Sequence, residues 1–316
     1  SVSPSSFTRT SERCSAGRSV FFSLNVIGSR FGCLHPVTIL RLYKTFCLPV
    51  LLYGCELWCI TQTELLMLER VHRKILRTVT GLPVRCNSKA LLLTLGTLSI
   101  RSMIHQRQLN FLHSFSSLPP DSLPRQLLLS LLNSPPSGGI VPRLLSLLSE
   151  YDLPSVNLVI SDRWSRDGWK RLTRRLLLAK EFTLFVETCS HIPLADCSSL
   201  SLGKVLPHLL VCRGLPRLSR QNNIRIRLLL NCAGLESETS NFRNATSDDT
   251  CKLCGSTSSE TASHFTAQCP ALSSVRNSLS PRSLIPLLAS DSQLFVDYVL
   301  GTIPPRPTVS CCIFIA

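Results

Sequence analysis

The sequence predicts a mostly α-helical chain with a small metal-binding module near its end. Three observations support this fold class. Apolar residues recur at the spacing of one helix face, helix start and stop signals bracket several stretches, and three cysteines and a histidine gather within residues 251–269. Of the 316 residues, 44% are hydrophobic and 17% are charged, which is typical of a globular rather than a disordered chain.

The first 115 residues carry the strongest helix signals. Residues 36–60 predict an apolar helix, in which Pro36 suits a first helical turn and Pro49 predicts a kink. The next helix is predicted to begin at a capping box formed by Thr61 and Glu64 and to stop at Gly81. Its apolar face consists of Leu65, Leu68, Val71, Ile75 and Val79. Residues 88–115 predict a helical pair that is broken near Gly96.

Composition divides the rest of the chain. Residues 116–145 are rich in proline and serine and predict a linker, and residues 146–240 form a basic helical region. Within that region, we expect a loop around Gly214 and Pro216 and a helix from Asn223 onward. Residues 245–280 hold the metal-binding module, and residues 281–316 form a tail without a helical signal. These boundaries are the predicted domain organisation.

The net charge of +15 favours an anionic partner, most often a nucleic acid or an acidic membrane surface. Lys and Arg number 34 against 19 Asp and Glu, and three basic stretches hold many of these cations. The alternative for each stretch is an ordinary solvated surface. Trp169 lies among the cations of the second stretch, where an indole can stack on a base but more often anchors a helix to a core. The candidate phosphate contacts are Arg70, Arg73, Lys74, Arg77, Arg163, Arg166, Lys170, Arg171, Arg174, Arg175, Arg213, Arg217, Arg220, Arg225 and Arg227.

Cys251, Cys254, His264 and Cys269 are spaced as C-x2-C-x9-H-x4-C. Three thiolates and one imidazole satisfy a tetrahedral Zn²⁺, and a site ligated only by protein is structural rather than catalytic. Gly255 follows the second thiol and can adopt the positive φ that the turn needs. The alternative is a pair of reactive or buried cysteines with an incidental histidine. Phe265 is a candidate for stacking on a base, although packing inside the module is the more ordinary role.

The sequence predicts no catalytic site. Polymerases and nucleases hold divalent metals on clustered carboxylates, and the adjacent pair Asp248 and Asp249 has no apolar strand to support it, so we expect a solvated loop there. Walker, G-x-S-x-G and HExxH patterns are absent. No run is apolar and long enough to predict a membrane span.

The cysteine pattern predicts an intracellular, reducing compartment, either the nucleus or the cytoplasm. The 15 cysteines are odd in number, and most stand singly in apolar surroundings, unlike a secreted disulfide framework. Residues 1–13 lack the apolar core of a signal peptide. The first residue is Ser, so we expect the chain to be a piece of a longer protein.

Several motifs, in their order, resemble the C-terminal part of reverse transcriptases of non-LTR (LINE-type, RTE/jockey-like) retrotransposons. Tyr53, Gly54, Glu56 and Trp58 match a P-x-x-x-Y-G-x-E-x-W helix end in "LPVLLYGCELW", which is followed by the basic helix "LERVHRKILRTVTGLP". The motifs "YDLPS", "DGWKR", "GLPRLSRQNNIRIRLLLNCAGLE" and C-x2-C…ETASHF…CP follow downstream, so the resemblance covers about residues 30–280.

This resemblance implies a thumb-like helical region, a basic linker and a Cys-Cys-His-Cys zinc knuckle that hold RNA template and target DNA. The aromatic-x-Asp-Asp palm and the endonuclease of the family are missing, so the chain is expected to be a non-catalytic, nucleic-acid-binding fragment. Two alternatives stay open: the palm of an active RNA-directed DNA polymerase lies upstream in the same protein, or the reading frame has decayed and has no function. Membrane and small-molecule partners are not expected.

Overall fold

The computed structural model describes residues 6–26, 28, 34–133, 138–161, 164–192, 194, 201–210, 216–239 and 248–273. Across these ranges every named element is a helix or a single helical turn, so the predicted mostly-α fold class is confirmed. The chain splits into two compact units. Unit 1 comprises Ser1–Val84, Ser88–Ser190 and Leu200–Leu206, and unit 2 comprises Arg85–Asn87, His191–Ser199 and Pro207–Ala316.

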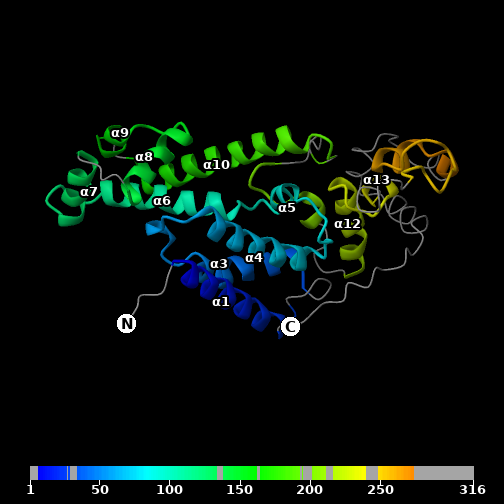
Figure 1. Ribbon diagram of the computed structural model, residues 1–316, viewed down its shortest axis with the longest axis horizontal. Helices are drawn as coiled ribbons and strands as arrows, with labels where there is room; N and C mark the ends of the chain where they lie inside the picture. The colour runs from blue at the N-terminus through cyan, green and yellow to red at the C-terminus, as the bar shows by residue number, and fades with distance from the viewer. Residues whose placement is uncertain are drawn as a thin grey trace. The chain divides into compact units, whose positions relative to one another are not determined.

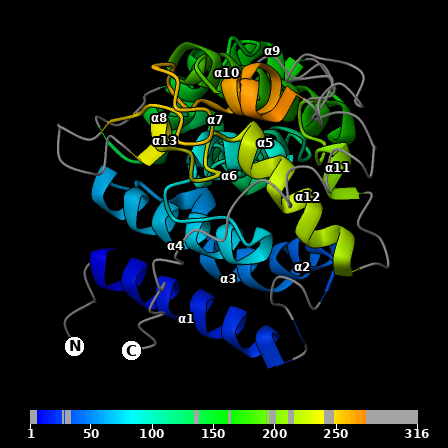
Figure 2. The ribbon, with the colours of Figure 1, turned by 90° about the vertical axis from the view of Figure 1, so that its right-hand side faces the viewer.

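Unit 1 is built from stacked helices. Figures 1 and 2 show α1 beside α4, with α6 on the other side of α4 and α10 packed on α6. Its elements are α1 (Ser6–Val26), α2 (Pro36–Leu42), η1 (Tyr43–Cys47), α3 (Leu48–Leu51), η2 (Cys55–Leu57), α4 (Gln62–Thr80), α5 (Ser88–Thr94), α6 (Ile100–Ser116), α7 (Leu123–Asn133), α8 (Ile140–Glu150), α9 (Val156–Ser161) and α10 (Arg166–Cys189).

Helix α4 has the boundaries that its sequence predicts. The backbone N–H of Glu64 donates to Thr61 Oγ1 at 3.3 Å, and the backbone N–H of Thr61 donates to Glu64 Oε2 at 2.9 Å, which completes the capping box. Gly81 ends the helix in the left-handed region, at φ 64°. The five apolar residues predicted on one face are all buried. Local signals and burial therefore agree along the whole helix.

Replacing Thr61 by Ala is expected to lower the free energy of unfolding by about 1 kcal/mol. The change removes the side-chain acceptor for the Glu64 N–H at the first turn of α4. Chemical denaturation followed by circular dichroism measures the effect. The control is Thr63→Ala, at an exposed position inside the first turn. Equal midpoints for the two variants would contradict a stabilising cap.

The segment around Pro49 is helical but changes its hydrogen-bond pattern along its length. Helix α2 begins with Pro36 in its first turn, as predicted, and passes into a π turn, η1, directly before α3. A proline has no N–H to donate to the preceding turn, and a wider turn accommodates this loss. A π turn thus interrupts the helix predicted over residues 36–60, and the α-helical run stops at Leu51 rather than reaching residue 60.

The predicted break between two helices at Gly96 is also confirmed. Helices α5 and α6 flank it, and Gly96 has a φ of 56°. A Cβ at this position would lie 2.5 Å from the backbone carbon of Lys204, so the close approach of two backbones requires glycine here. The segment 201–206 therefore packs directly on the α5–α6 connection, and Leu206 N–H donates to Thr94 O at 2.8 Å.

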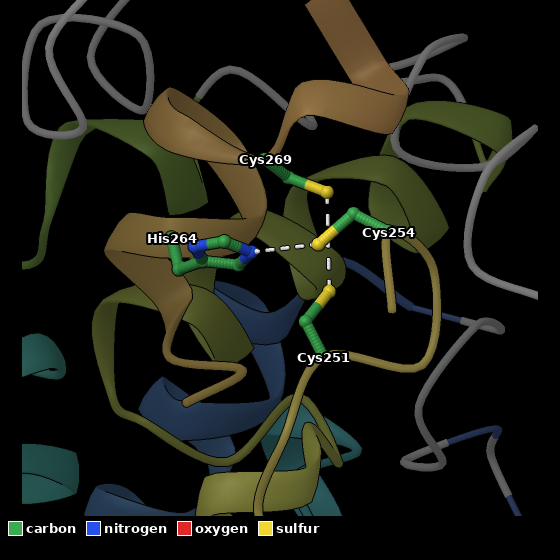
Figure 3. A group of neighbouring side chains, drawn as sticks. All are labelled: Cys251, Cys254, His264 and Cys269. Carbon is green, nitrogen blue, oxygen red and sulfur yellow. Dashed lines mark hydrogen bonds between the residues drawn. The ribbon is translucent and has the colours of Figure 1, made fainter. Parts of the chain in front are cut away.

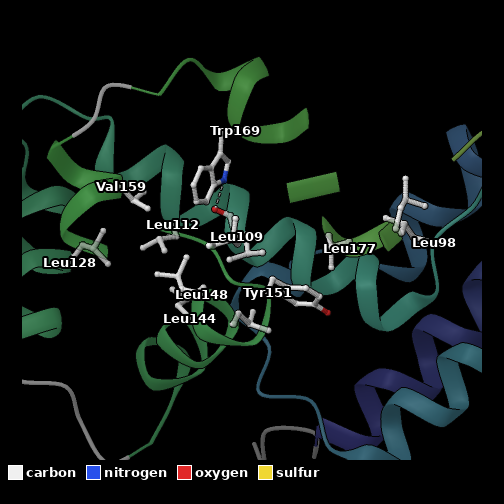
Figure 4. Close-up of a cluster of buried hydrophobic side chains, with 13 residues drawn as sticks. Leu98, Leu109, Leu112, Leu128, Leu144, Leu148, Tyr151, Val159, Trp169 and Leu177 are labelled. Carbon is white, nitrogen blue, oxygen red and sulfur yellow. Dashed lines mark hydrogen bonds between the residues drawn. The ribbon is translucent and has the colours of Figure 1, made fainter. Parts of the chain in front are cut away.

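Trp169 is part of the core of unit 1. Its indole is 1% exposed, and Nε1 donates to the backbone O of Leu109 at 3.1 Å. Figure 4 shows it above α6 among leucines from several helices, including Leu112, Leu144 and Leu177. The prediction that Trp169 anchors its helix to a core, rather than stacking on bases, is confirmed.

Unit 2 contains α11 (Pro207–Leu210), α12 (Pro216–Leu229), α13 (Glu236–Thr239), the π turn η5 (His264–Gln268) and the short turn η6 (Pro270–Leu272). The prediction of a loop before Asn223 is wrong, because α12 already begins at Pro216. Proline suits a first helical turn, so Pro216 starts the helix rather than delaying it. Helices also lie where none was predicted: α1, α7 within residues 116–145, and the first part of α8, which begins at Ile140.

Candidate metal centre and basic surfaces

A tight turn brings the first two cysteines together. Gly255 has a φ of 63°, and its N–H donates to Cys251 O at 3.0 Å. The chain then returns antiparallel to itself, with a bridge between Thr250 and Ser259 and a hydrogen bond from Cys251 N to Ser258 O. Both thiols therefore face the same side of the turn, as the C-x2-C spacing requires.

His264 and Cys269 come from the two ends of η5. The backbone N–H of Cys269 donates to His264 O at 2.7 Å, so the π turn places the two residues one above the other. In Figure 3, His264 and Cys269 project toward the two thiols of the turn.

The four side chains form a cluster that can hold a metal ion. Their ligand atoms all lie within 4.8 Å of one another. Cys251 Sγ and Cys269 Sγ are 3.9 Å apart, and Cys254 Sγ and His264 Nε2 are 3.5 Å apart. Tetrahedral coordination with metal–sulfur bonds of about 2.3 Å and metal–nitrogen bonds of about 2.0 Å places such pairs about 3.5–3.8 Å apart. Both distances fit that geometry.

The thiols differ in their environments. Hydrogen bonds from Ser256, first from its hydroxyl and then from its backbone N–H, lower the pKa of Cys254 to about 6. Burial raises the pKa of Cys269 to about 11. Metal binding requires the thiolate form of each cysteine ligand and releases the thiol protons. Cys254 thus offers a thiolate to an incoming cation more readily than Cys269 does.

The module has a small apolar interior. Phe265 is 1% exposed, and Ala262 and Leu272 are also buried. This burial supports the packing role of Phe265 over base stacking. So few apolar residues supply little stability by themselves, and small domains of this kind depend on a metal or a disulfide.

Glu260 joins the module to α13, a connection that the sequence did not predict. Its side chain is buried and accepts the backbone N–H of Glu236 at 2.8 Å, while its backbone O accepts the hydroxyl of Ser237 at 2.8 Å. Lys252 adds a salt bridge to Glu236 at 3.1 Å. Two hydrogen bonds of Glu260 and one salt bridge of Lys252 therefore hold the metal-binding module against α13.

Asp248 and Asp249 lie in an exposed loop, as predicted. Asp248 accepts hydrogen bonds from the backbone N–H and hydroxyl of Thr250, and Asp249 accepts from the hydroxyl of Ser259. These contacts stabilise the turn that leads to Cys251. Both carboxylates thus have a local structural role.

The basic face of α4 divides in two. Arg70 and Lys74 are exposed, whereas Arg73 and Arg77 are half-buried and donate to Ser88 Oγ at 3.5 and 3.0 Å. The second pair ties α4 to the start of α5. Only the first pair is fully presented to solvent.

The basic stretch on α10 lines an open cavity of about 490 Å³ between α6 and α10, which we call the α6–α10 groove. Two amide side chains of α6 and three cations of α10 contribute to it. The lining residues are Gln106, Asn110, Asp167, Lys170, Arg171 and Arg174. Amides and cations in this combination suit contacts to phosphate and sugar oxygens.

The remaining candidate cations are scattered over both units. Arg166 and Arg175 are exposed on α10, and Arg217 and Arg220 lie on α12. Arg163 and Arg213 lie outside the described residues. Within α12, Arg225 is 4% exposed and Arg227 is half-buried, and burial lowers the pKa of Arg227. A phosphate contact from Arg225 would therefore require a rearrangement, and the nucleic-acid role of all these residues stays a prediction.

Among the described helices, none combines the length and apolar character needed to cross a membrane. No family model, curated protein or solved structure matches the chain. The case for a function therefore rests on the Cys/His cluster and on the basic residues of the chain itself.

Proposed function

We propose that the chain is a non-catalytic, nucleic-acid-binding segment stabilised by one Zn²⁺. The observation that carries the proposal is the convergence of Cys251, Cys254, His264 and Cys269, whose ligand atoms lie within 4.8 Å of one another, with two pair distances that fit a tetrahedral ion. A ligand set of three thiolates and one imidazole favours zinc, and four protein ligands leave no open position for catalysis. The zinc would stabilise the fold of the module that contains its four ligands.

The proposed nucleic-acid contacts centre on the α6–α10 groove. Lys170, Arg171 and Arg174 line it against a single carboxylate, that of Asp167. Three cations spaced along one helix can neutralise several phosphates of one backbone. Because such contacts carry no base information, the binding would show little sequence preference.

The resemblance to LINE-type reverse transcriptases gives this proposal a context. We propose that the chain corresponds to the thumb, basic linker and zinc knuckle that follow the palm in those enzymes, and that it holds RNA template or target DNA without catalysing synthesis. The C-x2-C-x9-H-x4-C cluster and the preceding basic helices support this proposal by their order along the chain. The polymerase activity would require a palm upstream of this chain.

Binding to a short RNA hairpin or a DNA duplex is expected to weaken steeply with salt. Each phosphate contact releases condensed counterion, so three groove contacts predict a log–log slope of about −2 to −3. Fluorescence anisotropy between low and moderate salt measures the slope, with hairpins of unrelated sequence as comparison. An affinity that hardly varies with salt would overturn the electrostatic proposal.

A further inference from the structure

A second cavity in unit 1, of about 340 Å³, lies between the end of η2, the start of α4, helix α6 and the start of α8. Its volume falls within the range of small-molecule sites, about 300–1,000 Å³. The lining residues are Trp58, Cys59, Ile60, Thr61, Gln62, Leu65, Arg101, Ile104, His105, Gln108, Gly139 and Arg143. None of them is a carboxylate, and two are arginines.

The two arginines give the wall of this cavity a positive charge. The guanidinium of Arg101 donates to Gln62 Oε1 at 2.8 Å, and that of Arg143 donates to His105 Nε2 at 2.6 Å. Neither guanidinium forms a salt bridge with a carboxylate of the described residues. Glu69 accepts the backbone N–H of Arg101, but it does not line the cavity. Both charges are therefore available to an anion.

His105 is held neutral beside Arg143. A guanidinium only donates hydrogen bonds, so His105 Nε2 accepts and the ring proton is on Nδ1, directed to Tyr151 Oη at 2.7 Å. Burial, followed by Arg143, Arg101 and Lys180, lowers the pKa of His105 to about 3. The histidine thus orients Arg143 without adding charge to the cavity.

Gln108 and several apolar residues complete the wall of the cavity. Gln108 is 1% exposed; its Nε2 donates to the backbone O of Cys55 and Trp58, and its Oε1 has no hydrogen-bond partner among the described residues. Leu65, Ile104 and Trp58 add apolar and aromatic residues to the lining, and the guanidinium of Arg13 lies over the Trp58 ring, 4.5 Å from its centroid. A ligand that matches this wall carries an anionic group and a flat apolar part.

We propose that this cavity binds a nucleoside monophosphate. Its phosphate would lie between Arg101 and Arg143, and its base would face Trp58 and Leu65. Paired guanidiniums are well suited to phosphate oxygens, and an aromatic side chain provides a stacking surface for a base. The nucleotide can come from two sources: a free mononucleotide, or the phosphorylated 5′ end of a strand. The inference does not depend on zinc or on the α6–α10 groove.

Calorimetric titration of the full chain with AMP tests the site. We expect saturable binding, and binding of adenosine weaker by about tenfold or more, because adenosine lacks the group that the arginines contact. Arg101→Gln and Arg143→Gln should each weaken AMP binding by a similar factor. Arg101 is exposed, so its variant leaves the packing of unit 1 intact even if Arg143→Gln perturbs His105.

Arg41→Gln, at an exposed position of α2 outside the cavity, is the matched control and should bind AMP as the wild type does. Competition by a short oligonucleotide with a 5′-phosphate, but not by the same strand with a 5′-hydroxyl, would assign the nucleotide to a strand end. AMP binding without such competition would assign it to a free mononucleotide. Absence of both AMP binding and a 5′-phosphate effect, or unchanged binding by Arg101→Gln, would overturn the proposal.

Discussion

The double variant Cys254→Ser, His264→Ala is expected to lose its zinc, whereas the wild-type chain should hold about one equivalent. Two of the four ligands would be gone, one from the tight turn and one from η5. Structural zinc supplies about 10–16 kcal/mol of apparent folding free energy in small zinc modules. With so small an apolar interior, residues 248–273 should then unfold while unit 1 keeps its helices.

Elemental analysis of purified protein after dialysis measures the zinc, and amide hydrogen exchange measures the order of residues 248–273. The control is Cys59→Ser, His191→Ala, which replaces one exposed cysteine and one exposed histidine outside the cluster. This control should retain both the zinc and the protection of the backbone amides of residues 248–273 from hydrogen exchange. A full equivalent of zinc in the Cys254, His264 variant would show that the assignment of ligands is wrong.

Reversing Arg171, Arg174 and Arg175 to Glu is expected to weaken RNA and DNA binding by about 100-fold at low salt. Two of these residues line the α6–α10 groove, and the third is exposed on the same helix. The reversals of Arg171 and Arg174 each remove one groove contact, and all three reversals add a repulsive charge, so the log–log salt slope should also flatten by about 2. The loss should be uniform across sequences, because phosphates carry no base information.

The matched control reverses Arg9, Arg18 and Arg41, three exposed arginines of α1 and α2, and changes the net charge by the same amount. Anisotropy titrations at several salt concentrations compare the two variants. If both lose affinity equally, the effect arises from net charge rather than from the groove. If neither changes, the cations of α10 form an ordinary solvated surface.

Local signals predicted the parts of the structure that depend on neighbours in the sequence. The capping box at Thr61, the stop at Gly81 and the break at Gly96 each require only a few adjacent residues, and all three are present. The metal cluster also follows from short spacings, because a turn and a helical turn are enough to bring its ligands together. Helix α1 was not predicted because its apolar residues do not gather on one face of the helix.

The features that were missed depend on residues far apart in the sequence. The cavity of Arg101 and Arg143 forms only where α6 meets the start of α8, and the contact of Glu260 with α13 spans 24 residues. The spacing of residues along one helix or turn does not predict which distant elements will contact each other. The late start predicted for α12 was a different error, since Pro216 could have been recognised as a first-turn proline in the same way as Pro36.

The buried carboxylate of Glu260 determines how much of the chain would have to be moved to transplant the metal module into another protein. A piece starting at residue 245 would keep all four ligands but would lose the Glu236 N–H and the Ser237 hydroxyl that pair with Glu260. A hydrogen bond to a charged group contributes about 1.5–3 kcal/mol to stability. The portable unit therefore begins before α13, near Ala233 and Gly234, whose N–H groups Glu238 accepts.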